Sequence, residues 1–216
     1  MAEVRAVPAK VRPLIAPAKR PRRDSFDGDG ATEPFIASGK IAILMLVASE
    51  LMLFSGLVGP FLVYKGEAPF WPPPGLPRLP IFVTWINTFV LLSSAVTMYL
   101  GVRAVHQNRQ RVLRRWLGIT AILGGTFLAI QGSEWVRLVA HGLKLSSGTY
   151  GATFYTLIGL HGAHVTAAVI WLVCVVIAAM RGRYGAKNAG PVEMCAIYWY
   201  FVCAIWPALF VLVYLT

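Results

Sequence analysis

Long apolar runs without charged residues constrain this chain more than any other feature. The stretch FYTLIGLHGAHVTAAVIWLVCVV, from Phe154 to Val176, contains no Lys, Arg, Asp or Glu, and four other stretches are nearly as apolar. About 20 such residues, at 1.5 Å per residue in a helix, cross the roughly 30 Å of hydrocarbon in a bilayer. The chain is 57% hydrophobic and only 13% charged. The sequence therefore predicts an all-α membrane protein, a bundle of five transmembrane helices.

The apolar runs also predict how the chain is divided. The five predicted spans cover residues 41–64, 81–102, 116–138, 152–180 and 191–215. Together they form a membrane domain over residues 37–216. Residues 1–36 are rich in Pro, Lys and Arg and show no long helical periodicity, so we expect a disordered basic arm.

The distribution of basic residues predicts the orientation. Of the 20 Lys and Arg residues, sixteen lie in the arm, at Lys40 or in the segments that follow the second and fourth spans. Because Lys and Arg concentrate in cytoplasmic loops, we expect a cytoplasmic N-terminus and an extracytoplasmic C-terminus. The same clustering in short loops accounts for the net charge of +11, so no nucleic-acid partner is expected.

Several ionisable or amide side chains fall inside the predicted spans. Glu50 lies near the middle of the first span, where a lone charge costs about 2.5–3.5 kcal/mol. It is either a site that contacts lipid, protons or a cofactor-bearing partner, or a protonated side chain hydrogen-bonded inside the bundle. Gln131 and Glu134 are three residues apart on one helix face, which favours a structural hydrogen-bonded pair.

His161 and His164 also share a helix face, and they raise the question of a metal site. A haem with two axial histidines needs ligands on opposite sides of its plane, which one such pair cannot supply. A binuclear haem–copper centre needs more imidazoles than the four histidines of this chain. We therefore expect no metal site and no catalytic residue here, and hydrogen bonds from the two histidines to Glu50 or Glu134.

Two further patterns concern helix packing. Gly159, Ala163 and Ala167 recur every four residues, a spacing that lets a neighbouring helix approach closely. The last span carries large aromatic residues at mid-depth, where packing against protein is the default expectation. They are Tyr198, Trp199, Tyr200 and Trp206.

Four segments resemble subunit III of haem–copper terminal oxidases, the cytochrome c oxidase subunit III family. They are VASELMLFSG around Glu50, LAIQGSEW around Glu134, SGTYGATFYTLIGLHGAHV, and VEMCAIYWYFVCAIW, in the family's order over residues 40–216. Five spans match the short form of the family. In the last helix the sequence has Tyr200 and Cys203 where the family usually has His and Asp, which puts in doubt a polar contact made there to subunit I.

The resemblance implies a non-catalytic accessory subunit of a proton-pumping terminal oxidase in the inner (plasma) membrane of a prokaryote. Such a subunit packs against subunit I, binds phospholipid, and supports proton and oxygen delivery and stability during turnover. Haem and copper are expected only in partner subunits, and this chain would hold no cofactor of its own. Glu50 would be the buried carboxylate near the lipid cleft. The polar framework of the bundle would comprise Gln131, Glu134, His161, His164 and Glu193.

Two other functions remain open. The first is a subunit III-like accessory protein of a nitric oxide reductase, which has the same expected architecture. The second is a small proton channel or transporter that uses Glu50 and the two histidines as a relay. Transporters of this kind often contain internal repeats, and none is visible between the spans.

Overall fold

The computed structural model describes residues 33–71, 73 and 81–215, and in this part of the chain it contains only helices and connecting turns. The helices, in chain order, are α1 (Glu33–Glu67), α2 (Ile81–His106), α3 (Gln110–Ala140), α4 (Gly148–Met180), the short 3₁₀ turn η2 (Ala186–Asn188), α5 (Gly190–Phe210) and the π-helical turn η3 (Val211–Leu215). Five of them are long and apolar enough to cross a membrane. The prediction of an all-α five-helix membrane protein is confirmed.

The helices extend beyond several of the predicted spans. α3 begins at Gln110 rather than at residue 116, and α2 continues to His106. Hydropathy marks the apolar part of a helix, whereas the helix itself continues through polar residues outside the hydrocarbon. α1 begins at Glu33, inside the segment predicted as a basic arm, and residues 1–32 of that arm lie outside the described residues.

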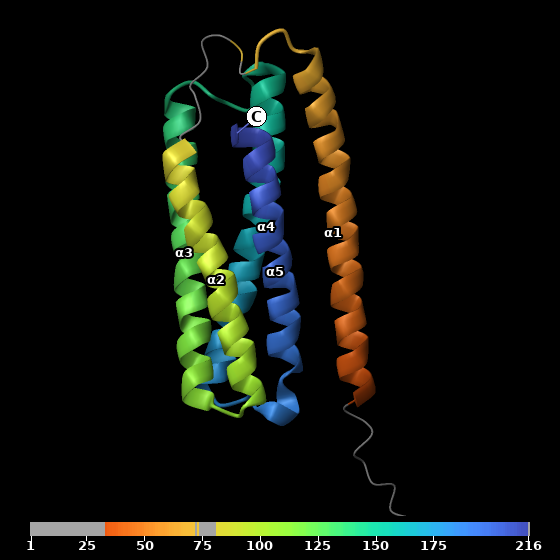
Figure 1. The fold of residues 1–216 in the computed structure, drawn as a ribbon, viewed down its shortest axis with the longest axis vertical. Coiled ribbons are helices and arrows are strands. Elements are labelled where there is room, and N and C mark those ends of the chain that lie inside the picture. Colours follow the sequence, from red (N-terminus) through yellow and green to blue (C-terminus); the bar gives the residue numbers. More distant parts are fainter. Residues whose placement is uncertain (1–32, 72, 74–80, 216) are drawn as a thin grey trace, which may run out of the picture.

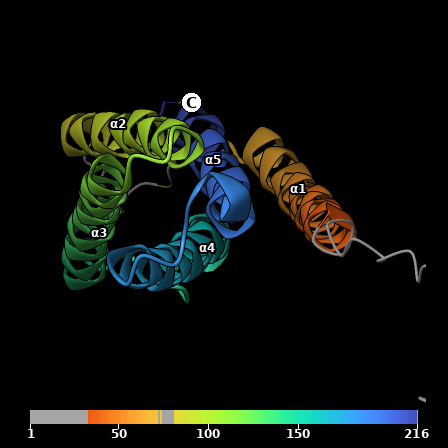
Figure 2. The ribbon, with the colours of Figure 1, turned by 90° about the horizontal axis from the view of Figure 1, so that it is seen from below.

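Helices α2, α3, α4 and α5 form a closed four-helix bundle, and α1 lies outside it against α5 and α4 (Figures 1 and 2). α1, α3 and α5 begin at the same end of the molecule, which we call the basic end (Figure 1). The described Lys and Arg residues at the basic end are Lys40, Arg103, Arg109, Arg111, Arg114, Arg115, Arg181, Arg183 and Lys187; those at the opposite end are Lys65, Arg137 and Lys144. Which end faces the cytoplasm stays a prediction.

Three helices end in the same hydrogen-bonded turn. After α2, the Asn108 N–H donates to the Val105 carbonyl and the Arg109 N–H donates to the Ala104 carbonyl, both at 3.0 Å. This is the Schellman pattern, which needs a left-handed residue, and Asn108 supplies it with a φ of 54°. Gly142 after α3 and Gly182 after α4 are the left-handed residues of the equivalent turns. In each turn, N–H groups that follow the helix donate to carbonyls of its last turn, so these carbonyls are bonded where the helix ends.

Helix α5 is fixed to α2 by side chains in the core. The Trp199 Nε1–H donates to Ser94 Oγ at 3.1 Å, and the Trp206 Nε1–H donates to Thr88 Oγ1 at 2.9 Å. Both indoles are fully buried. Large aromatic side chains thus fill the core while their single polar atoms are bonded, as an apolar interior requires.

Gly124 on α3 allows the Trp199 indole to lie directly against the α3 backbone. A Cβ atom added at Gly124 would collide with the Trp199 ring, whereas one added at the neighbouring Gly125 would meet no atom within 4 Å. The position of Trp199, and with it the α5–α2 contact, depends on the absence of a side chain at Gly124.

We therefore expect Gly124→Ala to destabilise the folded chain by about 1–3 kcal/mol, the usual effect of overpacking a core. The matched control Gly125→Ala is expected to be neutral or stabilising by up to about 1 kcal/mol, because alanine favours helix more than glycine does. Unfolding of the purified chain by a denaturing detergent in mixed micelles measures both. Equal effects of the two substitutions would contradict this account of the core.

Candidate functional site

Helix α1 contacts the rest of the bundle along one narrow stripe of side chains. The stripe residues are spaced alternately four and three apart and are buried or half-buried: Ile43, Val47, Glu50, Phe54, Leu57 and Phe61. Most apolar side chains on the other faces of α1 are exposed, which suits a helix surrounded by lipid. Glu50 therefore lies in the middle of the only face that α1 presents to protein among the described residues.

Glu50 is hydrogen-bonded to His164 of α4. The distance from Glu50 Oε2 to His164 Nε2 is 2.8 Å, and the two side chains are only 18% and 13% exposed. The other ring nitrogen, His164 Nδ1, lies 2.7 Å from the Leu160 carbonyl oxygen. This contact joins the two helices at the centre of the stripe.

The geometry determines the net charge of this pair. A carbonyl oxygen can only accept a hydrogen bond, so His164 Nδ1 must carry a proton. The short contact to Glu50 then needs one more proton, either on Nε2 of an imidazolium or on a protonated carboxyl group. A neutral imidazole beside a carboxylate would oppose two lone pairs. The pair therefore has zero net charge in either form, and its proton can shift along the hydrogen bond without placing a net charge in the apolar interior.

His161 lies one turn away but faces the core instead of α1. Its ring is 1% exposed and stacks on Trp206, with ring centroids 5.2 Å apart and planes at 25°. Neither ring nitrogen has a hydrogen-bond partner in the described part of the chain. A carboxylate partner was expected for both histidines, and only His164 has one. The reason is that residues three apart point about 60° apart around a helix, which turns His161 toward the core.

Phe54 packs against both imidazoles. Its ring centroid lies 5.3 Å from that of His164 and 6.3 Å from that of His161, with edge-on geometry in each case. Phe54 is one turn from Glu50 on the same stripe. The two histidines are therefore shielded by an aromatic ring from α1, which keeps the Glu50–His164 contact in an apolar environment.

Gln131 and Glu134 have separate partners, so the predicted pair between them is not formed within the described residues. Gln131 Nε2 donates to the Tyr214 hydroxyl at 3.2 Å, and Gln131 Oε1 accepts a long 3.5 Å hydrogen bond from Asn87 Nδ2. Glu134 instead lies 3.6 Å from the guanidinium of Arg137. The two side chains diverge around α3. Gln131 bonds to side chains in the core, whereas Glu134 reaches Arg137 in the last turn of the helix.

Glu193 joins three helix ends at the basic end. Its carboxylate forms an ion pair with Lys40 of α1 and lies 3.0 Å from His106 Nε2 of α2. Glu193 belongs to the first turn of α5, where a negative charge is favoured by the helix dipole. It therefore holds the basic ends of α1, α2 and α5 together.

In the row of small residues on α4, only Gly159 lies near another helix within the described chain, since a Cβ added there would meet the Trp135 ring of α3 at 3.9 Å. Ala163 and Ala167 are exposed and Gly159 is half-buried. The close approach on α4 is made by Gly162, where an added Cβ would lie 3.0 Å from the Trp135 ring. Four-residue spacing identifies a face of a helix, but it does not say which face the neighbouring helix meets.

The aromatic motif of α5 lies inside the bundle. Tyr198, Trp199, Cys203 and Trp206 are buried, and Tyr200 is half-buried. The Cys203 Sγ lies 3.8 Å from both Ser94 Oγ and the Leu91 carbonyl oxygen. Cys203 therefore faces α2 of the same chain, and its buried side chain offers no surface for a contact with another subunit.

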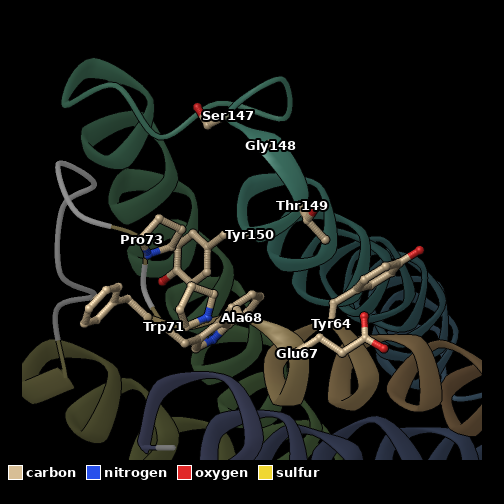
Figure 3. Close-up of a pocket in the computed structure, with 11 residues that line it drawn as sticks. Tyr64, Glu67, Ala68, Trp71, Pro73, Ser147, Gly148, Thr149 and Tyr150 are labelled. Atoms are coloured by element: carbon tan, nitrogen blue, oxygen red, sulfur yellow. The ribbon is translucent and has the colours of Figure 1, made fainter.

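A pocket of about 520 Å³ opens at the end opposite the basic end, between the last turn of α1 and the first turn of α4 (Figure 3). Tyr64 and Glu67 line it from α1, and Thr149 and Tyr150 line it from α4. The Trp71 ring packs edge-on against Tyr150 at 4.9 Å. Of its described lining residues Glu67 alone carries a charge. The lining therefore brings no acid–base pair together, unlike the Glu50–His164 site.

A family model for cytochrome c oxidase subunit III matches residues 23–216 of this chain. The chain belongs to the cytochrome c oxidase subunit III family. It is 34% identical over 174 residues to cytochrome c oxidase subunit 3 of Synechocystis sp., covering 80% of this chain and 73% of the relative. It is 35% identical over 176 residues to the same subunit of Thermostichus vulcanus, covering 81% and 86%. A probable cytochrome c oxidase subunit 3 of Nocardia farcinica is 33% identical over 174 residues.

In this subunit III chain a double-mutant cycle tests the Glu50–His164 contact. We expect a coupling free energy of about 1 kcal/mol between Glu50→Ala and His164→Ala, the size of a hydrogen bond between membrane helices. The matched control pairs Glu50→Ala with His161→Ala, which removes an imidazole from the same helix that has no bond to Glu50. Detergent unfolding of the four purified variants of each cycle gives both couplings. A coupling no larger than that of the control pair would contradict the contact.

Proposed function

We propose that this chain is a non-catalytic accessory subunit, subunit III, of a proton-pumping haem–copper terminal oxidase in aerobic respiration. The observation that carries the proposal is the match to cytochrome c oxidase subunit III over residues 23–216. The names of its relatives support the same role. The haem and copper would belong to partner subunits, and that this chain holds no cofactor stays a prediction.

The way α1 is attached supports a role in lipid binding beside subunit I. A groove of about 200 Å³ lies between α1 and α4, lined by Leu57 and Pro60 on one side and by Thr153 and Thr156 on the other. Leu57 is seven residues from Glu50, about 10 Å along the helix. The groove is mostly apolar and borders the stripe that contains Glu50. We propose that it holds a phospholipid acyl chain, and that the subunit supports proton and oxygen delivery and stability during turnover.

The proposed location is the plasma membrane of a prokaryote, crossed five times, with the basic end in the cytoplasm. The excess of Lys and Arg at the basic end among the described residues supports this orientation. The five apolar helices support a multi-pass protein, and relatives in Synechocystis and Nocardia are bacterial.

Gentle solubilisation and affinity purification through this chain test the proposed assembly. We expect the chain to copurify with subunits that show haem absorbance, and the complex to consume oxygen in a cyanide-sensitive way. The chain freed from the complex is expected to show no haem absorbance. Purification as a stable monomer without haem-containing partners would contradict the proposal, and reduction of nitric oxide without oxygen consumption would point to a nitric oxide reductase instead.

The proposed support of turnover predicts a specific effect of Glu50. Glu50→Ala removes the bond that holds α1 to α4 next to the lipid groove, so activity of the complex is expected to decay faster during continuous turnover. The rate of each variant is normalised to its own initial value, and Ser49→Ala, an exposed neighbour on α1, is the matched control. Equal decay in the wild type, the control and Glu50→Ala would rule out this role of Glu50.

A further inference from the structure

A second concave site lies at the basic end, between the end of α2 and the start of α3. This hairpin pocket has a volume of about 300 Å³, and its lining includes Leu100, Arg103, Gln107, Arg109, Val112 and Trp116. The Schellman turn at Asn108 shapes it, because the Arg109 N–H bonds back to the carbonyl of Ala104, the residue that follows Arg103. Two guanidinium groups six residues apart in sequence thus line one pocket.

These two guanidinium groups have no acidic partner in the described part of the chain. Toward residues 33–71, 73 and 81–215, neither the Arg103 nor the Arg109 side chain makes a hydrogen bond or an ion pair. Among the carboxylates whose side chains the structure describes, Glu193 lies at the same end and is engaged with Lys40 and His106. Glu50 and Glu134 pair with His164 and Arg137, and Glu67 lines the pocket at the opposite end. Arginine is the residue best suited to bind phosphate oxygens in a two-pronged way, so the pocket has an unmatched preference for an anion.

The start of α3 adds to the positive potential. Arg109, at the cap position, makes no side-chain hydrogen bond to the first turn. Within the described residues, the first backbone N–H of α3 that has an acceptor is that of Leu113, which donates to the Arg109 carbonyl. The N–H groups of Gln110, Arg111 and Val112 are left for another acceptor. Free N–H groups at a helix start favour a bound anion, here beside the two arginines.

The remaining lining residues indicate which anion fits. Leu100 and Val112 are apolar, and Trp116 is a half-buried indole about one and a half turns into α3. Tryptophan is enriched at the level of lipid headgroups in membrane proteins. A free inorganic anion would use only the cationic side of the pocket, whereas a phospholipid would use both sides.

We propose that the hairpin pocket binds the phosphodiester headgroup of an anionic phospholipid in the leaflet at the basic end, with the lipid backbone against Leu100, Val112 and Trp116. This site is separate from the groove beside Glu50 and independent of the proposed oxidase role. The probe is phosphatidylglycerol with brominated acyl chains, because bromine quenches a nearby indole. The full-length chain is placed in phosphatidylcholine bilayers, and the Trp116 signal is taken as the difference between the wild type and Trp116→Phe.

We expect brominated phosphatidylglycerol to quench Trp116 in preference to brominated phosphatidylcholine. The ratio of the two binding constants obtained from quenching should be on the order of thirtyfold, as two arginine charges would give. In Arg103→Gln/Arg109→Gln the preference should fall to near unity. The matched control Arg111→Gln/Arg115→Gln removes the same charge from the same hairpin but from residues outside the pocket lining, and it should keep most of the preference.

Three outcomes would overturn the proposal. An equal loss of preference in the two double variants would mean diffuse attraction to the membrane surface. Displacement of the brominated lipid by inorganic phosphate at constant ionic strength would mean a site for free phosphate. Equal quenching of the wild-type Trp116 by both brominated lipids would mean no anion site, and this result needs no arginine variant. None of these outcomes bears on whether the chain assembles with haem-containing partners.

Discussion

The cost of leaving a polar group unbonded in an apolar interior governs this structure. Water is absent from the hydrocarbon region, so a buried donor or acceptor without a partner inside the protein costs free energy. Helices α2 and α5 avoid this cost with indole-to-hydroxyl bonds at Ser94 and Thr88, and α1 avoids it with Glu50 and His164. Because each bond joins different helices, satisfying the polar groups also determines which helices are neighbours.

The two modes of attachment differ in strength and location. The four-helix bundle is held by a continuous core with two fully buried tryptophans. Helix α1 has one narrow stripe, a central hydrogen bond and the ion pair between Lys40 and Glu193 at the basic end. A helix held in this way leaves most of its surface to lipid.

Hydropathy predicted the five helices because length and apolarity alone decide which segments can cross a membrane. The partners of the polar side chains could not be predicted in the same way. A three-residue spacing places His161 and His164 on roughly one face, yet about 60° of rotation sends one to the core and the other to α1. Asn87, Ser94 and Thr88 were missed because single short polar residues in an apolar span carry no pattern. Their role appears only when α2 lies against α3 and α5.

The alternating spacing of the α1 stripe restricts how this helix can change its length. A repeat of seven residues keeps one face toward its neighbours, so Ile43, Glu50 and Leu57 occupy equivalent positions in successive heptads. A single residue inserted between Glu50 and Phe54 would rotate the rest of α1 by about 100° and turn Phe54 and Phe61 into the lipid. A whole inserted heptad would restore the rotation but shift the following residues by about 10 Å along the axis, away from their partners. Changes in length are therefore tolerated only beyond the ends of the stripe, whereas substitutions on the outer faces of α1 are limited by little more than hydrophobicity.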